Sequence, residues 1–487
     1  MTKINCFVAC NETAQTNKTV QQISQSPIVK NVYLLVKKGN NIQIDGCQTL
    51  EIDSIQSSET IRKIADNSDA AYSLIYTKDT TLELGQYALE RLFHIAESTK
   101  AGLVYADYYQ IVNGIRSNLP LIDYQEGSLR DDFNFGSMLF YNSECLKKVV
   151  AETTEIYQFA GLYNLRLKVS QQAELVHINE YLYSEVETDT RKSGEKQFDY
   201  VDPKNRAVQL EMEAICTDHL KKIGAFLAPE FKKIEFNESN FPVEASVIIP
   251  IKNRVKTVED AIKSVLMQKT SFDFNLIIID NFSTDGTSEL IQKYVRADNR
   301  VIHIIPERTD LGIGGCWNAG VDTTLCGKFS VQLDSDDVYQ DENTLQTIVN
   351  AFYEQNCAMV IGSYTMTNFN METIAPGLID HKEWTLENGR NNALRINGLG
   401  APRAFYTPLL REIKVPNTSY GEDYALGLRI SREYRIGRVY ESLYLCRRWD
   451  ENSDASLDVA KMNGYNLYKD KIRTIELKAR KKMTPNP

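Results

Sequence analysis

The sequence lacks the features of a membrane-spanning or disulfide-bonded protein. No apolar run approaches the roughly 18 residues that cross a bilayer, and residues 1–15 lack the long apolar core of a signal peptide. The nine cysteines are odd in number and show no CxxC spacing, which argues against a disulfide framework and against a zinc site. We therefore expect a cytoplasmic protein with reduced thiols.

Histidine is also scarce, and basic residues are fewer than acidic ones. The five histidines show no metal-ligand spacing, and 55 lysines and arginines face 65 aspartates and glutamates. The resulting net charge of −10 argues against a broad nucleic-acid-binding surface. The 43% of hydrophobic and 25% of charged residues are typical of a soluble globular protein, and 487 residues suggest two or three domains.

Apolar strand patterns alternate with helical patterns along most of the chain. Predicted strands span residues 4–9, 31–36, 70–76, 102–108, 245–251, 274–280, 300–305 and 329–333. Predicted helices span residues 16–26, 82–98, 205–227, 257–268, 287–295 and 463–482. This alternation predicts an α/β fold with mainly parallel sheets.

The polar stretch 187–203 divides the chain into two such α/β regions. We predict a first domain at 1–190, a linker with a helix at 191–244, a second domain at 245–457 and a C-terminal basic helix and tail at 458–487. The basic helix could lie on an anionic membrane surface, such as the inner membrane. Docking onto the protein is the preferred interpretation, because its apolar residues do not form one broad stripe.

Polar residues follow three predicted strands of the second region. They are Asn253–Arg254, Asp280–Asn281 and the acidic run Asp334–Asp337, which contains three carboxylates. In a parallel sheet these strand ends fall on one edge, where they could meet one ligand. Like charges this close repel unless water or a cation neutralises them, and carboxylates suit Mg²⁺ or Mn²⁺. A solvated acidic turn is the simpler alternative. The glycine-rich stretch 311–320 permits close backbone approach, although such a loop alone is a weak signal.

Six motifs together resemble family 2 glycosyltransferases with the GT-A fold. They are SVIIPIKNR (246–254), IIIDNFSTDGT (277–287), LGIGGCWNAG (311–320), QLDSDD (332–337), GEDYALGLRI (421–430) and CRRWDENSDAS (446–456). The resemblance covers roughly residues 245–457. It implies an inverting transfer of a hexosyl or N-acetylhexosaminyl group from a nucleotide-sugar donor, with a UDP-sugar favoured, in the presence of Mn²⁺ or Mg²⁺. The implied acceptor is a hydroxyl of a glycan, a lipid-linked saccharide or another glycoconjugate.

The resemblance also implies roles for single residues. The nucleotide pocket would comprise Pro250, Asn253, Arg254, Asp280, Asn281, Gly312 and Asn318. Asp334 and Asp336 match the family's DxD motif, with Asp336 as the metal ligand, Asp334 near the donor sugar or the metal, and Asp337 in support of either. The segment that closes over the diphosphate would contribute Arg447, Arg448, Asn452 and Ser453.

Asp423, paired with Glu422, matches the family's catalytic base, which takes the proton of the attacking hydroxyl. The acidic pair could instead serve only the N-terminus of a helix, where the dipole favours negative charge. The stretch 377–403 would face the acceptor, with Trp384, Gly398 and Gly400 as candidates, although Trp384 could equally fill a core. The sequence 445–449 reads LCRRW and lacks the glutamine of the family's QxxRW motif, which argues against a processive polysaccharide synthase.

Residues 160–183 and 421–444 are similar to each other without a gap. Seven of these 24 positions are identical, where roughly one or two are expected by chance. Gly161 and Leu162 stand where the second copy has Glu422 and Asp423. We also align Tyr76 with Asp334 and Lys78 with Asp336, so the first domain is predicted to be a degenerate GT-A-like domain. Rival hypotheses are a polymerase with two active domains and a non-catalytic protein that binds sugar nucleotides or glycans.

Overall fold

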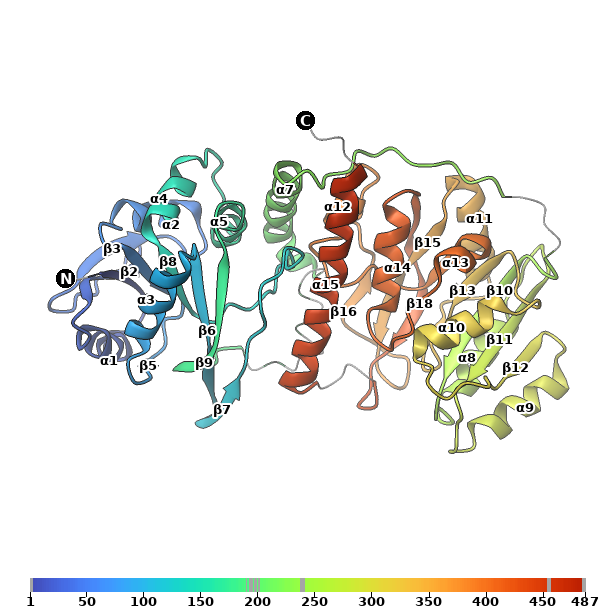
Figure 1. Ribbon diagram of the computed structural model, residues 1–487. Helices are drawn as coiled ribbons and strands as arrows, with labels where there is room; N and C mark the ends of the chain where they lie inside the picture. Colours follow the sequence, from blue (N-terminus) through green and yellow to red (C-terminus); the bar gives the residue numbers. More distant parts are fainter. Residues whose placement is uncertain are drawn as a thin grey trace. The chain divides into compact units, whose positions relative to one another are not determined.

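The computed structural model describes residues 3–189, 191, 196, 199, 202–236, 241–452 and 457–483. The chain divides into two compact units. The first comprises Met1–Lys196, Pro203–Phe226 and Leu457–Pro487, and the second comprises Gln197–Asp202 and Leu227–Ser456. Each unit is an α/β structure built on its own sheet (Figure 1). Two α/β domains were predicted from the alternating sequence pattern.

The first unit contains a nine-stranded sheet in its described residues, in the order β3-β2-β1-β4-β8-β6-β9-β5, with β7 on β6. Its strands are β1 (Ile4–Cys10), β2 (Val29–Lys37), β3 (Gln48–Ile52), β4 (Tyr72–Tyr76), β5 (Leu82–Leu84), β6 (Leu103–Val112), β7 (Ile115–Leu119), β8 (Met138–Asn142) and β9 (Leu175–Val186). Its helices are α1 (Thr13–Ser24), α2 (Ser58–Asp66), α3 (Ala88–Thr99), α4 (Ser143–Ala151), α5 (Gly161–Ser170), the 3₁₀ helix η1 (Pro203–Asn205), α7 (Arg206–Lys222) and α15 (Val459–Met483).

The second unit contains a nine-stranded sheet in the residues that the structure describes, in the order β12-β11-β10-β13-β17-β15-β18-β14, with β16 on β15. Its strands are β10 (Ala245–Ile251), β11 (Phe274–Asp280), β12 (Val301–Ile304), β13 (Phe329–Gln332), β14 (Val338–Tyr339), β15 (Met359–Thr367), β16 (Thr373–Ile379), β17 (Arg403–Tyr406) and β18 (Ile436–Arg447). Its helices are α8 (Val258–Leu266), α9 (Thr287–Ala297), α10 (Ile313–Asp322), α11 (Thr344–Gln355), α12 (Gly389–Asn392), α13 (Thr407–Ile413) and α14 (Glu422–Ser431).

The two sheets have the same topology, strand for strand in chain order. Individual hydrogen bonds recur as well. The N–H of Tyr72 donates to the Lys3 carbonyl at 3.0 Å, and the N–H of Phe329 donates to the Glu244 carbonyl at 2.9 Å. The repeat that was predicted from 160–183 and 421–444 therefore extends over both sheets.

The sheets are mixed, where the sequence pattern predicted mainly parallel ones. In the second unit β10 pairs in parallel with β11 and β13, but β17 runs antiparallel to both β13 and β15. The first unit repeats this, with β8 antiparallel to β4 and β6. Alternation of helices and strands does not specify the direction of a strand that inserts between two others, so this feature was not visible in the sequence.

Two sequence assignments differ locally from the structure. The helix predicted over residues 82–98 is split, because β5 occupies Leu82–Leu84 and α3 begins only at Ala88. The glycine-rich stretch that was read as a loop instead begins a helix, since α10 spans Ile313–Asp322.

The helix predicted as a linker and the C-terminal helix both pack within the first unit. On α7, the Glu211 carboxylate accepts the N–H groups of Gln158, Phe159 and Ala160, which precede α5, at 2.7–3.0 Å. On α15, buried Asp470 accepts from the Ser128 hydroxyl at 2.9 Å. A docked C-terminal helix was the preferred interpretation of the basic tail. Among the described residues no helix is long and apolar enough to cross a membrane.

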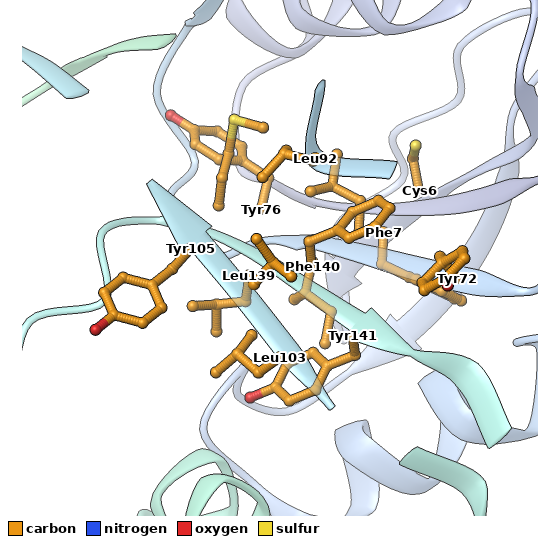
Figure 2. Packing of buried hydrophobic residues seen from close by; sticks show 14 of the residues in the cluster. Cys6, Phe7, Tyr72, Tyr76, Leu92, Leu103, Tyr105, Leu139, Phe140 and Tyr141 are labelled. Atoms are coloured by element: carbon orange, nitrogen blue, oxygen red, sulfur yellow. The ribbon is translucent and has the colours of Figure 1, made fainter. Parts of the chain in front are cut away.

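Aromatic residues form much of the first unit's core. The rings of Tyr72 and Phe140, from the antiparallel strands β4 and β8, stack with centroids 5.2 Å apart (Figure 2). Phe7 on β1 stacks in the same way on Tyr33 of β2, at 4.9 Å. Large buried rings contribute much apolar area, and offset stacking adds to it. Aromatic pairing across the strands therefore stabilises this sheet.

Candidate functional site

Two loops at the carboxyl ends of β10 and β11 are joined by hydrogen bonds. The Asn253 side-chain oxygen accepts from the N–H of Thr284 at 2.8 Å, and the N–H of Asn253 donates to the Ser283 hydroxyl at 3.0 Å. The N–H of Arg254 donates to the Thr287 hydroxyl at 2.9 Å. Pro250 lies half-buried on β10 beside Ile279 of β11. The residues predicted to surround a nucleotide base thus lie on adjacent loops.

Asp280 is buried beneath these loops. Its carboxylate accepts from the Ser283 N–H at 2.9 Å, from the Ser288 hydroxyl and from His303 Nε2 at 3.2 Å. Burial alone would raise its pKa, but these hydrogen bonds hold the pKa of Asp280 below its usual value. The carboxylate is therefore an ionised support for the 281–288 loop, and its place in the nucleotide pocket stays a prediction.

The glycines and Asn318 of α10 pack against the loop that precedes α14. A Cβ at Gly312 would come within 2.7 Å of the Thr418 backbone, and one at Gly314 would collide with the Pro416 carbonyl. The Asn318 amide donates to the Val415 carbonyl at 2.8 Å and accepts from the Val415 N–H at 2.9 Å. The close backbone approach predicted for this motif is thus made by the protein itself. Asn281, whose amide donates to the Leu311 carbonyl at 2.9 Å, ties α10 to the 281–288 loop.

The acidic run follows β13 and is neutralised only in part by the protein. Asp334 accepts from the Gln332 amide at 2.9 Å, and Asp337 accepts from the Arg447 N–H at 2.7 Å. Burial raises the pKa of both carboxyls, and repulsion from Asp336 adds to this. Asp336 is half-buried and accepts from Trp449 Nε1 at 3.2 Å and from Asn452 Nδ2 at 3.1 Å. The three acids therefore form one electrostatically strained cluster.

The segment after β18, which was predicted to close over the diphosphate, contacts the acidic run through Trp449 and Asn452. Buried Arg447 pairs with Asp260 at 2.8 Å, and the N–H of half-buried Arg448 donates to the Thr367 carbonyl at 2.7 Å. The Asn452 amide bridges Asp336 and the Arg447 carbonyl, each at 3.1 Å. Ser453, the last predicted member of this segment, lies outside the described residues.

The carboxylates at the start of α14 connect to the acidic run through two side chains. Arg403, the first residue of β17, pairs with Asp423 at 2.5 Å, and its N–H donates to the Gln332 side-chain oxygen at 3.2 Å. The Gln332 amide in turn holds Asp334. A continuous network thus joins Asp423 to Asp334. Sequence reasoning missed Arg403 and Gln332 as members of this network, because Arg403 lies 71 residues from Gln332 and 20 residues from Asp423 in the chain.

Among the described residues, the neighbouring acid, Glu422, lacks the arginine partner that Asp423 has. Its Oε2 is buried and has no hydrogen-bond partner. Burial, together with the charge of Asp423, raises the pKa of Glu422 to about 7. Glu422 therefore changes its protonation state near neutral pH.

We expect stability to depend on pH through Glu422. Its folded-state pKa lies above the ordinary value of 4.5, so the folded protein binds the proton more tightly than the unfolded chain does. The stabilisation is complete below pH 4.5 and is lost as the pH rises to about 7, a change on the order of 3 kcal/mol. Urea unfolding of the metal-free protein from pH 5 to pH 8 should show this decline, and Glu422→Gln should flatten it.

Glu433→Gln is the matched control for this experiment. The pKa of Glu433 is lowered by its hydrogen bond from Lys232, so its loss should leave the slope between pH 5 and pH 8 unchanged. Parallel stability curves for the wild type and Glu422→Gln would contradict the assignment.

The predicted acceptor residues are mostly part of the core. Trp384 is 6% exposed, and a Cβ on Gly389 would come within 2.7 Å of its ring. Gly400 has φ of +103° and packs on His381, while its carbonyl accepts from Arg403 at 3.0 Å. Of the three candidates only Gly398 is not buried. Trp384 therefore fills a core, which was one of its two predicted roles, and Gly400 supports Arg403.

A divalent cation fits the acidic run only with ligands from outside the protein. No group of three His, Cys, Asp or Glu side chains among the described residues is arranged to hold a metal ion. Mg²⁺ and Mn²⁺ at phosphate-binding sites commonly take one or two carboxylates and complete their coordination with phosphate and water. Asp336 and Asp334 supply such a partial donor set, and the raised pKa of Asp334 is what an unneutralised cluster produces.

In the first unit the loop after β4 corresponds to the acidic run after β13, but the two differ in strand register and in charge. Strand pairing equates Tyr76 with Leu333 rather than with Asp334, because Tyr72 and Phe329 occupy the same register position. The loop is also two residues longer in the first unit, so Lys78 has no single counterpart. Our sequence alignment of Tyr76 and Lys78 with the DxD acids was therefore wrong in detail.

The charges in that loop are paired within the protein. Lys78 Nζ lies 2.6 Å from buried Glu185 and 3.6 Å from Glu187, both on or next to β9. The paired strands equate Glu187 with Arg448 of the second unit. The first unit thus has a lysine in the loop where the second unit has acids, and an acid, Glu187, at the position of Arg448. A lysine here opposes cation binding, and Gly161 and Leu162 do begin α5 where Glu422 and Asp423 begin α14.

Comparisons with known proteins identify the central part of this unit. Residues 246–408 match the family model described as glycosyl transferase family 2. The chain is 29% identical over 119 residues to the glycosyltransferase GlyG of Streptococcus pneumoniae, which is 24% of this chain and 38% of GlyG. It is 30% identical over 128 residues to the putative teichuronic acid biosynthesis glycosyltransferase TuaG of Bacillus subtilis, which is 26% of this chain and 49% of TuaG.

The chain thus spans less than half the length of either relative. Among solved structures, S. aureus TarS 1–349 in complex with UDP-GlcNAc superposes with a TM-score of 0.37 and 20% identity, over 49% of this chain and 72% of that one. The family match ends at residue 408, before Glu422, Asp423 and the segment after β18.

Proposed function

We propose that the protein transfers a sugar from a nucleotide-diphosphate donor to a hydroxyl acceptor, because residues 246–408 match the family model of glycosyl transferase family 2. A UDP-sugar is the favoured donor, and a glycan, a lipid-linked saccharide or another glycoconjugate is the acceptor. The similarity to TuaG, a putative teichuronic acid biosynthesis glycosyltransferase, agrees with a role in bacterial surface-glycan assembly.

The observation that carries this proposal is the network from Asp423 through Arg403 and Gln332 to Asp334. An inverting transfer needs a proton acceptor on one side of the sugar and stabilisation of the departing diphosphate on the other. Asp423 is 26% exposed and held in one orientation by Arg403, so one carboxylate is fixed and accessible to an acceptor hydroxyl. The acidic run at the other end of the network supplies the second function.

Asp336 and Asp334 are the residues that would hold a divalent cation together with the diphosphate. When bound, Mg²⁺ or Mn²⁺ supplies positive charge against the negative charge that builds on the leaving nucleotide. The protein's own contribution is to order this region. Asn452 and Trp449 hold the Asp336 carboxylate by hydrogen bonds. Arg448 adds a positive charge within the same segment.

The first unit is proposed to have no transferase activity of its own. Its counterpart of the acidic run is neutralised by the Lys78–Glu185 ion pair, and its α5 begins with Gly161 and Leu162. These features disfavour the hypothesis of a polymerase with two active units. Cytoplasmic location is likewise part of the proposal, with peripheral contact to the inner membrane as an extension of it.

A donor screen tests the proposed function. Purified protein is heated with an excess of Mn²⁺ and with UDP-, GDP- and dTDP-sugars in turn. A ligand present at about 100 times its Kd stabilises the folded state by about 2.7 kcal/mol, so the correct donor should raise the melting temperature by several degrees. Absence of any shift with all three classes of donor would reject the proposal.

A further inference from the structure

Phe282 has a backbone conformation that aromatic residues seldom adopt. It lies two residues after Asp280 at the carboxyl end of β11, with φ of 61° and its side chain 39% exposed. A positive φ in a bulky residue is strained, and such strain persists where the surroundings impose it, often at functional sites. More than a third of the residue stays exposed to solvent, so the ring keeps surface that a ligand could contact.

The surroundings of Phe282 do impose its conformation. Its N–H donates to the Asp280 carbonyl at 2.9 Å, and the next residue, Ser283, is held by the buried Asp280 carboxylate. Asn253, which also has a positive φ of 54°, fixes Thr284 from the adjacent loop. The strained ring is thus presented by a rigid, hydrogen-bonded pair of loops.

Two other exposed apolar side chains lie on loops that are tied to this one. Val255 is 37% exposed, and its N–H donates to Asp285 at 3.1 Å. Ile313 is 39% exposed and begins α10 two residues after Leu311, whose carbonyl binds the Asn281 amide. Three hydrogen-bonded loops therefore each carry one partly exposed apolar side chain, and two of these loops also carry Asn253 and Asn281.

We propose that Phe282 is the surface on which the nucleobase of the donor stacks, with Val255 and Ile313 at the margin of the same site. This inference rests on the proposed function. A base has two flat apolar faces and a polar edge, and aromatic rings with nearby amides suit both. The acidic run follows β13, which pairs directly with β10, so the base site and the diphosphate site are on neighbouring strands.

In this arrangement Phe282 and Asp280 have different roles. Asp280 is buried and shapes the loop, and Phe282 makes the contact. A patch that serves instead to bind another protein would share the exposure of the ring, but it would not respond to the nucleobase.

Phe282→Gly tests the proposal through two effects of opposite direction. Glycine adopts φ of 61° freely, so the melting temperature should rise by about 2–4 °C. Stacking on an aromatic side chain contributes about 5- to 100-fold to affinity, so the Kd of the nucleoside diphosphate should rise by that factor. Calorimetric titration with Mn²⁺ measures the Kd, using whichever of UDP, GDP or dTDP binds the wild type most tightly.

Three controls complete the experiment. Phe282→Tyr keeps the ring and should bind within about twofold of the wild type. Inorganic pyrophosphate lacks a base and should bind Phe282→Gly and the wild type equally. Tyr87→Gly removes another exposed ring with positive φ, 72% exposed and in the first unit, and should leave nucleotide affinity unchanged.

Each contrary result has one meaning. Unchanged nucleotide affinity in Phe282→Gly would overturn the stacking role, and so would an equal loss of pyrophosphate affinity, which indicates a distorted loop. A lower melting temperature would identify the ring as a packing residue and would also overturn it. If the wild type binds none of the three nucleotides, the proposed function itself fails and the inference falls with it.

Discussion

Replacing Asp423 by asparagine should abolish sugar transfer and leave donor binding intact. Asparagine retains a side-chain oxygen that can accept from Arg403, so the ion pair becomes a neutral-to-charged hydrogen bond and the local geometry is preserved. An amide cannot take a proton from the acceptor hydroxyl, and loss of a general base typically lowers the rate 10²- to 10⁴-fold. Transfer is measured with the donor that the thermal screen identifies, and donor Kd is measured by calorimetry.

Asp298→Asn is a matched control for Asp423→Asn. Asp298 also pairs with an arginine, Arg300, at 2.7 Å, and its side chain is 23% exposed against 26% for Asp423. Because it lies before β12, outside the proposed site, its replacement should leave transfer unchanged. Donor affinity that falls in Asp423→Asn as strongly as the rate does would assign Asp423 to donor binding and remove it as the base.

Replacing Asp336 by alanine should remove the response of the protein to divalent cations. Asp336 is the proposed metal ligand and accepts from Trp449 and Asn452, so the variant loses both this ligand and the anchor of the closing segment. Loss of the proposed cation from the diphosphate should lower transfer by several hundred-fold or more, since such charge stabilisation is worth several kcal/mol. Titration with Mn²⁺ should restore wild-type activity after chelation and should have no effect on the variant.

Asp79→Ala provides the control in the first unit. Asp79 follows Lys78 in the loop after β4, so the substitution removes an acid from the corresponding loop of the other unit. We expect full activity and a full Mn²⁺ response from this variant. Equal activity of Asp336→Ala and the wild type in the presence of chelator would reject the metal-binding role. Loss of the Mn²⁺ response in Asp79→Ala would show that the first unit takes part in catalysis.

The sequence was sufficient for the α/β class and the internal repeat because the signals for them are local. Continuous apolar runs predicted both bounds of β10 (Ala245–Ile251) and of β11 (Phe274–Asp280) correctly. The repeat was visible because Tyr163, Leu165 and Leu167 pack at the same positions of α5 as Tyr424, Leu426 and Leu428 do in α14. The family resemblance was visible because its motifs keep their order along the chain, and the family model later matched residues 246–408.

The direction of the central strands and the register of the loops were not predictable in this way. Whether β17 runs parallel or antiparallel to β13 depends on pairing between segments about 75 residues apart. The mistaken alignment of Lys78 with Asp336 has the same origin, because the strand register and the two additional loop residues become visible only in the strand pairing.

The sequence by itself determined which kinds of residue this protein places at the ends of its strands. It identified the acids after β13, the Glu422–Asp423 pair and the polar ends of β10 and β11, since each is a local departure from an apolar pattern. Only the tertiary structure decided what these residues contact. In the structure Asp280 and Trp384 are buried, and the glycines at the start of α10 pack against the loop before α14. Asp423 is connected to Asp334 through Arg403 and Gln332. The physical reason is that burial and hydrogen-bond partners depend on segments distant in the chain, whereas polarity is a property of the residue itself.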